Sequence, residues 1–235
     1  MKIAVFFSGR ITGWKNCINT LKTKFTDLYD TDVFLSLDLK EEDDEVREFK
    51  NTFNVVNCYY EQYIKFLKDI PYKSEETSER KSLSMFYHNL SAIKMILAHI
   101  KKTDVKYDVI VKFRADISTN DTFLIHHNVT ANTVYFPYGF CYRGINDQIG
   151  YGDLNSMVIY CGVYNHIPKY VYIDKAIFNP EFLLMYHLNF NNFNIIRFPY
   201  NYILHPDRFK NDMEMNNIPI IKKISLLELE SQFNN

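Results

Sequence analysis

The sequence predicts a single α/β domain in which a mostly parallel central sheet is flanked by helices. Three observations lead to this prediction. Short β-branched or aromatic runs recur through the first half of the chain, apolar residues recur three and four apart between them, and the two patterns alternate as far as residue 116. Strands that alternate with helices favour a mostly parallel sheet.

The first half of the chain supplies most of the predicted sheet. Strands are expected at residues 2–10, 32–38, 54–60 and 108–113. Helices are expected at residues 14–28 and 82–100, where apolar side chains recur at helical spacing. The acidic segment 40–50 is interpreted as a solvated helix or loop, and residues 61–80, which include Pro71, as a surface excursion.

Beyond residue 116 the alternation ceases. Strands are expected at 132–140 and 193–204, and helices at 154–161, 179–188 and, as a short terminal helix, 224–233. Between them lies a loop, residues 145–153, with two glycines. The chain shows no repeat, linker or low-complexity segment, so we expect one domain over residues 1–235.

Composition limits the kinds of partner. Hydrophobic residues make up 47% of the 235-residue chain, which is enough for a sizeable core. The formal charge of -1 provides no basic field for a nucleic acid polymer or an anionic membrane. A small anionic ligand held by a few local cations fits better. No apolar run reaches the roughly 18 residues of a membrane span, and the amino-terminal run is too short for a signal peptide, so we expect a soluble, cytoplasmic protein. Cys17, Cys58, Cys141 and Cys161 show no metal-binding spacing and are expected to be reduced.

Ser8, Gly9 and Arg10 directly follow the first predicted strand. A small residue at this position lets the backbone approach a ligand, and an arginine can bind phosphate or carboxylate with two hydrogen bonds. An ordinary strand-to-helix turn would have the same composition. No phosphate-binding glycine motif stands nearby.

The stretch "YDVIVKFRADI", residues 107–117, gives the stronger signal. Its β-branched run indicates a buried strand, and it ends in Arg114 and Asp116. Charged residues at the carboxyl end of such a strand lie where open α/β sheets bind their ligands. The carboxylate could hold a divalent cation on a pyrophosphate, and the arginine could neutralise phosphate charge. A purely structural Arg–Asp pair is the alternative.

These motifs occur in an order that resembles a known family. "FFSGR", "DVFLS", "SLSMFYHNLSAIKMI", "YDVIVKFRADI", "NDQIGYGDLNSMVIY" and "FNPEFLLMYHL" resemble small glycosyltransferases of the GT-A type, found in giant viruses and bacterial surface-polysaccharide clusters. The resemblance covers roughly residues 3 to 208. It implies a GT-A-like (Rossmann-like) domain, with residues 1–117 as the nucleotide-sugar half and 118–235 as the acceptor half. For a viral protein, the compartment would be the host cytoplasm.

The resemblance implies a set of donor-binding residues and a cofactor. The donor, for example a UDP-sugar, would contact Ser8, Gly9, Arg10, Ser36, Met85, Arg114 and Asp116. The last aspartate of the family's Asp-x-Asp motif, which binds Mn²⁺ or Mg²⁺, corresponds to Asp116. The first is Arg114 here. One carboxylate is a poor solitary ligand for such a cation, so metal dependence stays open. Met85 fits a core position equally well.

The loop before the helix at 154–161 is the candidate acceptor side. An inverting glycosyl transfer needs a carboxylate to accept the proton of the acceptor hydroxyl, and Asp147 is the candidate base. Gln148 beside it and Glu181 near Pro180 would contact the acceptor, a glycan or glycoprotein. Structural alternatives are a loop cap for Asp147 and a helix-dipole partner for Glu181. Asp153 is the expected N-cap of the following helix.

The sequence therefore predicts a nucleotide-sugar-dependent glycosyltransferase. Two other classes stay open. One is a sugar- or nucleotide-binding module that keeps the fold without the chemistry, which the absent first aspartate suggests. The other is a sugar-phosphate nucleotidyltransferase, for which "SGRITGWK" would be a thin version of the required glycine- and lysine-bearing loop.

Overall fold

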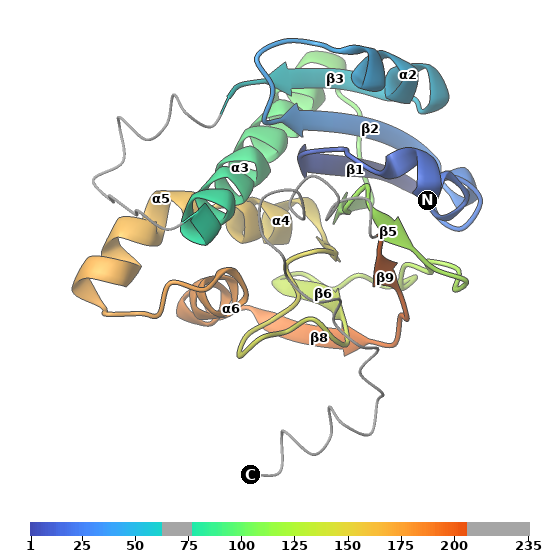
Figure 1. Ribbon diagram of the computed structural model, residues 1–235. Helices are drawn as coiled ribbons and strands as arrows, with labels where there is room; N and C mark the ends of the chain where they lie inside the picture. Colours follow the sequence, from blue (N-terminus) through green and yellow to red (C-terminus); the bar gives the residue numbers. More distant parts are fainter. Residues whose placement is uncertain (63–76, 206–235) are drawn as a thin grey trace. The chain divides into compact units, whose positions relative to one another are not determined.

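The computed structural model describes residues 1–62 and 77–205. The main sheet has the strand order β3-β2-β1-β4-β7-β6-β8 (Figure 1). Only β7 is antiparallel to its neighbours, β4 and β6. The predicted α/β class with a mostly parallel sheet is therefore confirmed. Its strands are β1 (Lys2–Gly9), β2 (Asp30–Leu37), β3 (Val55–Tyr60), β4 (Val109–Lys112), β6 (Thr133–Pro137), β7 (Gly150–Gly152) and β8 (Asn194–Phe198).

The central strands β1, β2 and β4 are apolar at successive positions because both faces of the sheet are covered. Val5 of β1 lies opposite Val33 of β2 and Val111 of β4. All three side chains are buried. Continuous apolar runs of this kind are typical of parallel strands inside an α/β sheet.

Four helices cover one face of the sheet in the described part of the chain. They are α3 (Thr77–Thr103), α4 (Leu154–Cys161), α5 (Val163–Pro168) and α6 (Pro180–Phe190). Phe86 and Ile93 of α3 join Ala4, Phe6 and Ile110 of the sheet in one buried apolar cluster. The predicted helices 82–100, 154–161 and 179–188 are therefore confirmed, the first as part of a longer helix. A π-helical turn, η4 (Lys169–Ile173), follows α5, and neither was predicted.

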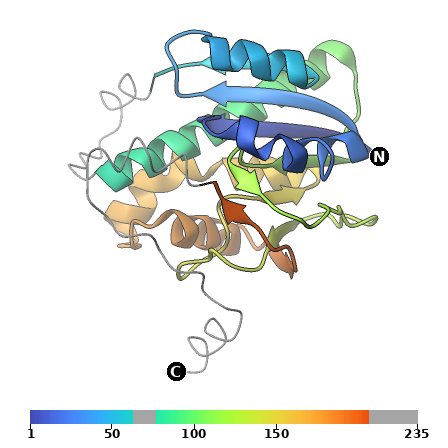
Figure 2. The ribbon, with the colours of Figure 1, turned by 45° about the vertical axis from the view of Figure 1, so that its right-hand side comes forward.

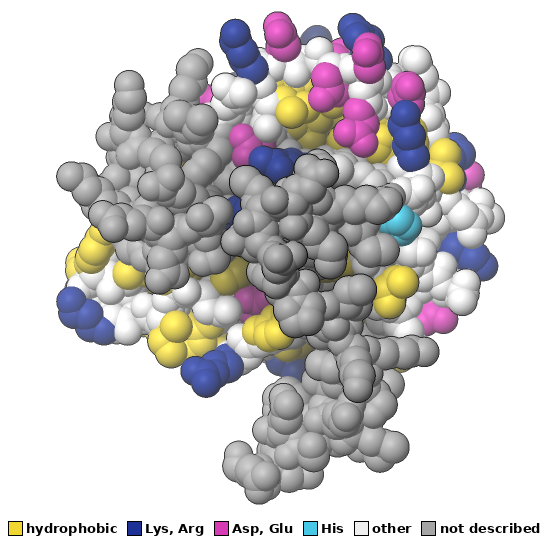
Figure 3. Space-filling model, viewed as in Figure 1, with side chains coloured by type: hydrophobic (Ala, Val, Ile, Leu, Met, Phe, Trp, Pro, Cys, Tyr) yellow, Lys and Arg dark blue, Asp and Glu magenta, His cyan; other side chains and the backbone are white. Residues whose placement is uncertain are grey.

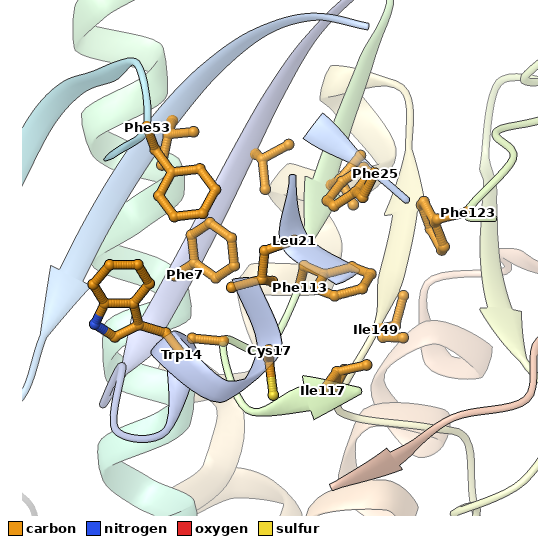
Figure 4. Close-up of a cluster of buried hydrophobic side chains, with 14 of the residues drawn as sticks. Phe7, Trp14, Cys17, Leu21, Phe25, Phe53, Phe113, Ile117, Phe123 and Ile149 are labelled. Carbon is orange, nitrogen blue, oxygen red and sulfur yellow. The ribbon is translucent and has the colours of Figure 1, made fainter. Parts of the chain in front are cut away.

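The other face is covered by shorter elements and an aromatic core (Figure 4). The helix expected at 14–28 is broken into η1 (Trp14–Cys17), α1 (Ile18–Leu21) and η2 (Thr26–Leu28). The apolar stripe expected there is confirmed in part: Trp14, Cys17, Leu21 and Phe25 are buried, whereas Ile18 and Leu28 are exposed. Threonine and asparagine are poor helix formers, and Thr20 instead exchanges hydrogen bonds with the backbone of Thr119.

The acidic segment forms α2 (Asp44–Thr52), capped by Asp43, whose carboxylate accepts the Val46 N–H at 2.9 Å. Figure 3 shows acidic and basic side chains gathered over this part of the surface. The expected N-cap Asp153 is confirmed, because its carboxylate accepts the Ser156 N–H at 2.7 Å. The four cysteines, all in the described part of the chain, are free thiols.

The last predicted strand, 193–204, is divided into β8 and β9 (Ile203–Leu204). Pro199 lies in the break, and proline cannot donate a ladder hydrogen bond. The strand β9 pairs with β5 (Ile117–Ser118), which directly follows the "FRAD" stretch (Figure 2). This small sheet brings the end of the described chain beside Asp116, whose carbonyl accepts the His205 N–H at 2.7 Å.

Two predictions concern residues outside the described ranges, the terminal helix at 224–233 and most of the surface excursion at 61–80. Within the described ranges no helix is long and apolar enough to cross a membrane.

Candidate functional site

The topology of the sheet indicates where a ligand would bind. From β1 the strand order continues to β2 on one side and to β4 on the other, so a topological switch point lies between β1 and β4. In open α/β sheets, ligands bind outside the carboxyl ends of the strands at such a point. Ser8, Gly9 and Arg10 lie at this end of β1, and Arg114 and Asp116 follow β4. The two sequence motifs thus meet at one edge of the sheet.

The end of β1 leaves open space at this edge. Ser8 Oγ donates a hydrogen bond to Asn89 Oδ1 of α3 at 2.6 Å. Gly9 has φ = +85°, and a Cβ at this position would meet no atom within 4 Å. The left-handed conformation suits glycine and turns the chain out of the sheet. Arg10 is exposed beside it, so this turn presents backbone and one cation to solvent.

The amino-terminal part of α3 is fixed to the end of β2 by polar contacts. Ser36 Oγ and His88 Nδ1 are 2.9 Å apart and both side chains are fully buried. Burial lowers the pKa of His88 to about 4, so its ring is neutral at neutral pH. Ser84 donates to the Asp38 carboxylate at 3.1 Å. Met85 packs against the apolar cluster of α3. Ser36 and Met85 therefore have internal partners, and their contact with a donor stays a prediction.

Arg114 and Asp116 form a bidentate ion pair at the end of β4. Arg114 Nε donates to Asp116 Oδ1 at 2.8 Å, and Nη2 donates to Oδ2 at 2.6 Å. The Asp116 side chain is only 8% exposed, whereas that of Arg114 is 24% exposed. The turn after β1 lies against the pair, because a Cβ on Gly13 would be 3.8 Å from the Cβ of Asp116. The pair thus joins the two strand ends at the switch point.

Lys112 is the last residue of β4 and lies two residues before Arg114, which follows the strand. Its ammonium donates a hydrogen bond to the main-chain carbonyl of Asp147. The register explains this contact, since Lys112 pairs with Gly150, which follows the loop between β6 and β7, residues 138–149 (the β6–β7 loop). Burial lowers the pKa of Lys112 to about 8, and the nearby Asp147 carboxylate opposes that shift.

Asn146 organises the β6–β7 loop from inside. Its Nδ2 donates to the carbonyl of Gly139 at 2.9 Å and to the Tyr202 hydroxyl at 2.7 Å. Its Oδ1 accepts the N–H groups of Gln148 and Ile149, at 2.9 and 3.0 Å. The Tyr202 hydroxyl in turn donates to Gln148 Oε1 at 3.0 Å. All these side-chain contacts hold the residues on both sides of Asp147 in place.

The Asp147 carboxylate itself is differently placed. The residue as a whole is 8% exposed, and within residues 1–62 and 77–205 no N–H or O–H group donates a hydrogen bond to its carboxylate. Its charge acts on Lys112, Arg114 and Glu181. Such a carboxylate has acceptor capacity to spare, and the cations Lys112 and Arg114 lie near it. It can therefore accept a hydrogen bond from the hydroxyl group of a bound molecule.

Glu181, at the start of α6, is 7% exposed. Burial and, next, the negative charge of Asp147 raise its pKa to about 7, against the attraction of Lys112. The β6–β7 loop packs directly on its backbone: the Ile145 N–H donates to the Glu181 carbonyl at 3.2 Å, and a Cβ on Gly144 would collide with that carbonyl. This close approach places the helix start beside the loop that carries Asp147.

With Glu181 protonated, the charges of this cluster balance. Lys112 and Arg114 supply two cations, and Asp116 and Asp147 supply two carboxylates. The cluster therefore combines a hydrogen-bond acceptor with cations at the switch point of the sheet.

The sequence was compared with known protein families and with curated proteins. A family model described as "Domain of unknown function (DUF7796)" matches residues 73–225, more than half of the chain. The chain belongs to the DUF7796 family. No curated protein matches it. The matched part of this DUF7796 chain contains Arg114, Asp116, Asp147 and Glu181, whereas Ser8 lies before it.

Within residues 1–62 and 77–205, the surroundings of Asp116 do not fit a divalent cation in this DUF7796 protein. Both oxygens of the Asp116 carboxylate are bound by Arg114. In the described part of the chain, no three His, Cys, Asp or Glu residues are grouped so that they could hold a metal ion. A hard cation such as Mg²⁺ requires several oxygen ligands, and here both oxygens of the Asp116 carboxylate are already paired with a guanidinium.

The DUF7796 structure brings most of the predicted residues together. Arg114, Asp116, Asp147, Gln148 and Glu181 lie in or beside one buried cluster, and Ser8, Gly9 and Arg10 lie at the neighbouring strand end. Sequence reasoning missed Lys112, Asn146 and Tyr202. The signal for Lys112 was a cation inside an apolar run, two residues before Arg114. No comparable signal connected Asn146 with Tyr202, because their contact depends on the tertiary fold.

Proposed function

We propose that this DUF7796 protein is a glycosyltransferase that moves a sugar from a nucleotide-sugar donor to a hydroxyl group of a glycan or glycoprotein. The observation that carries the proposal is the position of Asp147, a carboxylate with free acceptor capacity, beside the cations that follow the switch point. The sheet, mostly parallel with one antiparallel strand, supports a GT-A-like domain. The resemblance of the sequence motifs to GT-A enzymes supports the same assignment.

The donor would bind at the carboxyl ends of β1 and β4. Its diphosphate would lie near Arg114, and the open turn at Gly9 would let the backbone approach the nucleotide. Arg10 supplies a further cation at this edge. The chain has a net charge of -1 and therefore no extended basic surface. A nucleotide is small enough to be held by a few local cations instead.

In the transfer step, the acceptor hydroxyl oxygen attacks the anomeric carbon of the donor. The bond from that carbon to the diphosphate oxygen breaks, and its electron pair leaves with the diphosphate. Asp147 takes the hydroxyl proton as the new bond forms. Because attack occurs opposite the leaving group, the product has the inverted anomeric configuration. Gln148 and the protonated Glu181 would orient the acceptor through hydrogen bonds.

The experiment is a donor panel. The full chain is incubated with UDP-, GDP- and dTDP-sugars, each with and without Mn²⁺, and free nucleoside diphosphate is measured. We expect slow hydrolysis of one donor class, since water replaces the missing acceptor. Binding without turnover would favour a non-catalytic binding module. Release of pyrophosphate from a nucleoside triphosphate and a sugar phosphate would instead identify a nucleotidyltransferase. We propose a cytoplasmic reaction, since such donors are cytoplasmic metabolites.

A further inference from the structure

The Arg114–Asp116 pair stands where a metal-dependent enzyme of the proposed type would have two carboxylates. Both Asp116 oxygens accept hydrogen bonds from the guanidinium, at 2.8 and 2.6 Å. The pair is braced from two more sides, by the turn at Gly13 and by the His205 N–H on the Asp116 carbonyl. A cation that bound Asp116 would first have to break a bidentate, charge-assisted contact.

The guanidinium has donor capacity left after binding Asp116. Its Nε and one hydrogen of Nη2 are used by the carboxylate, and Nη1 contacts no acceptor in the described ranges 1–62 and 77–205. The Arg114 side chain is 24% exposed. The Asp116 carboxylate therefore fixes the plane of the guanidinium, while the remaining N–H groups are available to an anion. Arginine held in this way is well suited to phosphate.

We infer that this protein binds the diphosphate of its donor without a divalent cation, with Arg114 supplying the positive charge that a metal ion would otherwise supply. The inference rests on the proposed function, because it concerns the leaving group of that reaction. The guanidinium N–H groups donate to the diphosphate oxygens and stabilise the charge that they gain when the sugar leaves. Asp116 acts as a positioning residue for Arg114. Lys112, at the end of β4 and two residues before Arg114, adds a second positive charge nearby.

Calorimetry on the full chain tests the inference with UDP, GDP and dTDP, each titrated in EDTA and in Mn²⁺. We expect one nucleoside diphosphate to bind with the same Kd in both buffers. Arg114→Gln should weaken its binding by about 10- to 100-fold in EDTA, the range for hydrogen bonds to a charged group. Arg47→Gln is the matched control, because Arg47 is an exposed arginine on α2, paired with Asp44, and should leave Kd unchanged.

The double variant Arg114→Gln/Asp116→Asn guards against misfolding of the single variant, since it leaves no unpaired carboxylate in the buried site. We expect the same loss of affinity, and no recovery in Mn²⁺. Binding that requires Mn²⁺ in the wild type, or an undiminished affinity of the folded Arg114→Gln protein, would overturn the inference and leave the proposed function intact. If no nucleoside diphosphate binds in either buffer, the proposed function falls and the inference with it.

Discussion

Glu181 is buried beside Asp147, and its folded-state pKa of about 7 lies above the ordinary value of 4.5. Between those values the folded protein binds more protons than the unfolded chain, so Glu181 makes the free energy of unfolding fall as the pH rises. Glu181→Gln removes this dependence. We expect the variant to gain stability relative to wild type from pH 5 to pH 8, by on the order of 1–3 kcal/mol, as measured by urea unfolding at each pH.

Glu41→Gln provides the control for Glu181→Gln, because Glu41 is an exposed carboxyl near the start of α2. A difference between Glu181→Gln and wild type that stays constant with pH would show that the folded protein does not hold this carboxyl in its protonated form.

Lys112 bears on the charges beside the proposed base. Its ammonium lies next to the Asp147 carbonyl and attracts the Asp147 carboxylate. Lys112→Met removes a positive charge that opposes the rise of the Glu181 pKa, so that pKa should rise further and the pH profile of the free energy of unfolding should move to higher pH. Lys106→Met, at an exposed lysine outside the cluster, should leave the profile unchanged. An unshifted profile in folded Lys112→Met would remove Lys112 from the site.

At the scale of elements, the site depends on the contact between the β6–β7 loop and the start of α6. Gly144 lies so close to the Glu181 carbonyl that a Cβ would overlap the backbone. Backbone cannot rotate away as a side chain does, so Gly144→Ala should separate the loop from the helix and cost about 3 kcal/mol of stability. Hydrogen exchange at the Ile145 amide, which donates to Glu181, should become faster.

Gly139→Ala is the matched change in the same loop. Gly139 has φ = +89°, so alanine is strained there, but its Cβ would meet no atom within 4 Å. The expected cost is the backbone strain alone, about 1–2 kcal/mol, with slow exchange retained at Ile145. Equal costs for the two substitutions would mean that the loop does not need its close contact with α6.

The elements also show what local sequence can predict. The strand at 108–113 and its charged end were predictable, because a β-branched run and its alternation are local properties. The strand β7, with the sequence Gly-Tyr-Gly, was not, because glycine is depleted in strands and its place follows from pairing with β4 and β6. Gly150 and Gly152 are closely approached by Phe136 and the Thr133 carbonyl, which only the fold reveals.

The same distinction applies to the candidate site. Asp147 was predicted from its loop, and Arg114 and Asp116 from their strand end. That the guanidinium binds both Asp116 oxygens, and that Asn146 and Tyr202 brace the loop, depend on distances across the chain. Spacing in the sequence carries no information on those distances.

At the scale of the whole molecule, the carboxyl ends of the strands would carry two separate binding regions. In the proposed function, donor contacts would lie at the ends of β1 and β4, and acceptor contacts would lie on the β6–β7 loop and α6. A variant of the base should therefore lose transfer without losing donor affinity.

Asp147→Asn, compared with Asp153→Asn, measures this most directly. Asp153 caps α4 in the same stretch of chain, and asparagine caps a helix equally well. Turnover is followed as nucleoside diphosphate released from the donor, and donor Kd by calorimetry. Asp147→Asn should lose about 10²- to 10⁴-fold in turnover at an unchanged donor Kd, while Asp153→Asn should retain both. Full turnover in folded Asp147→Asn, or a loss confined to donor binding, would contradict the assignment of Asp147 as the base.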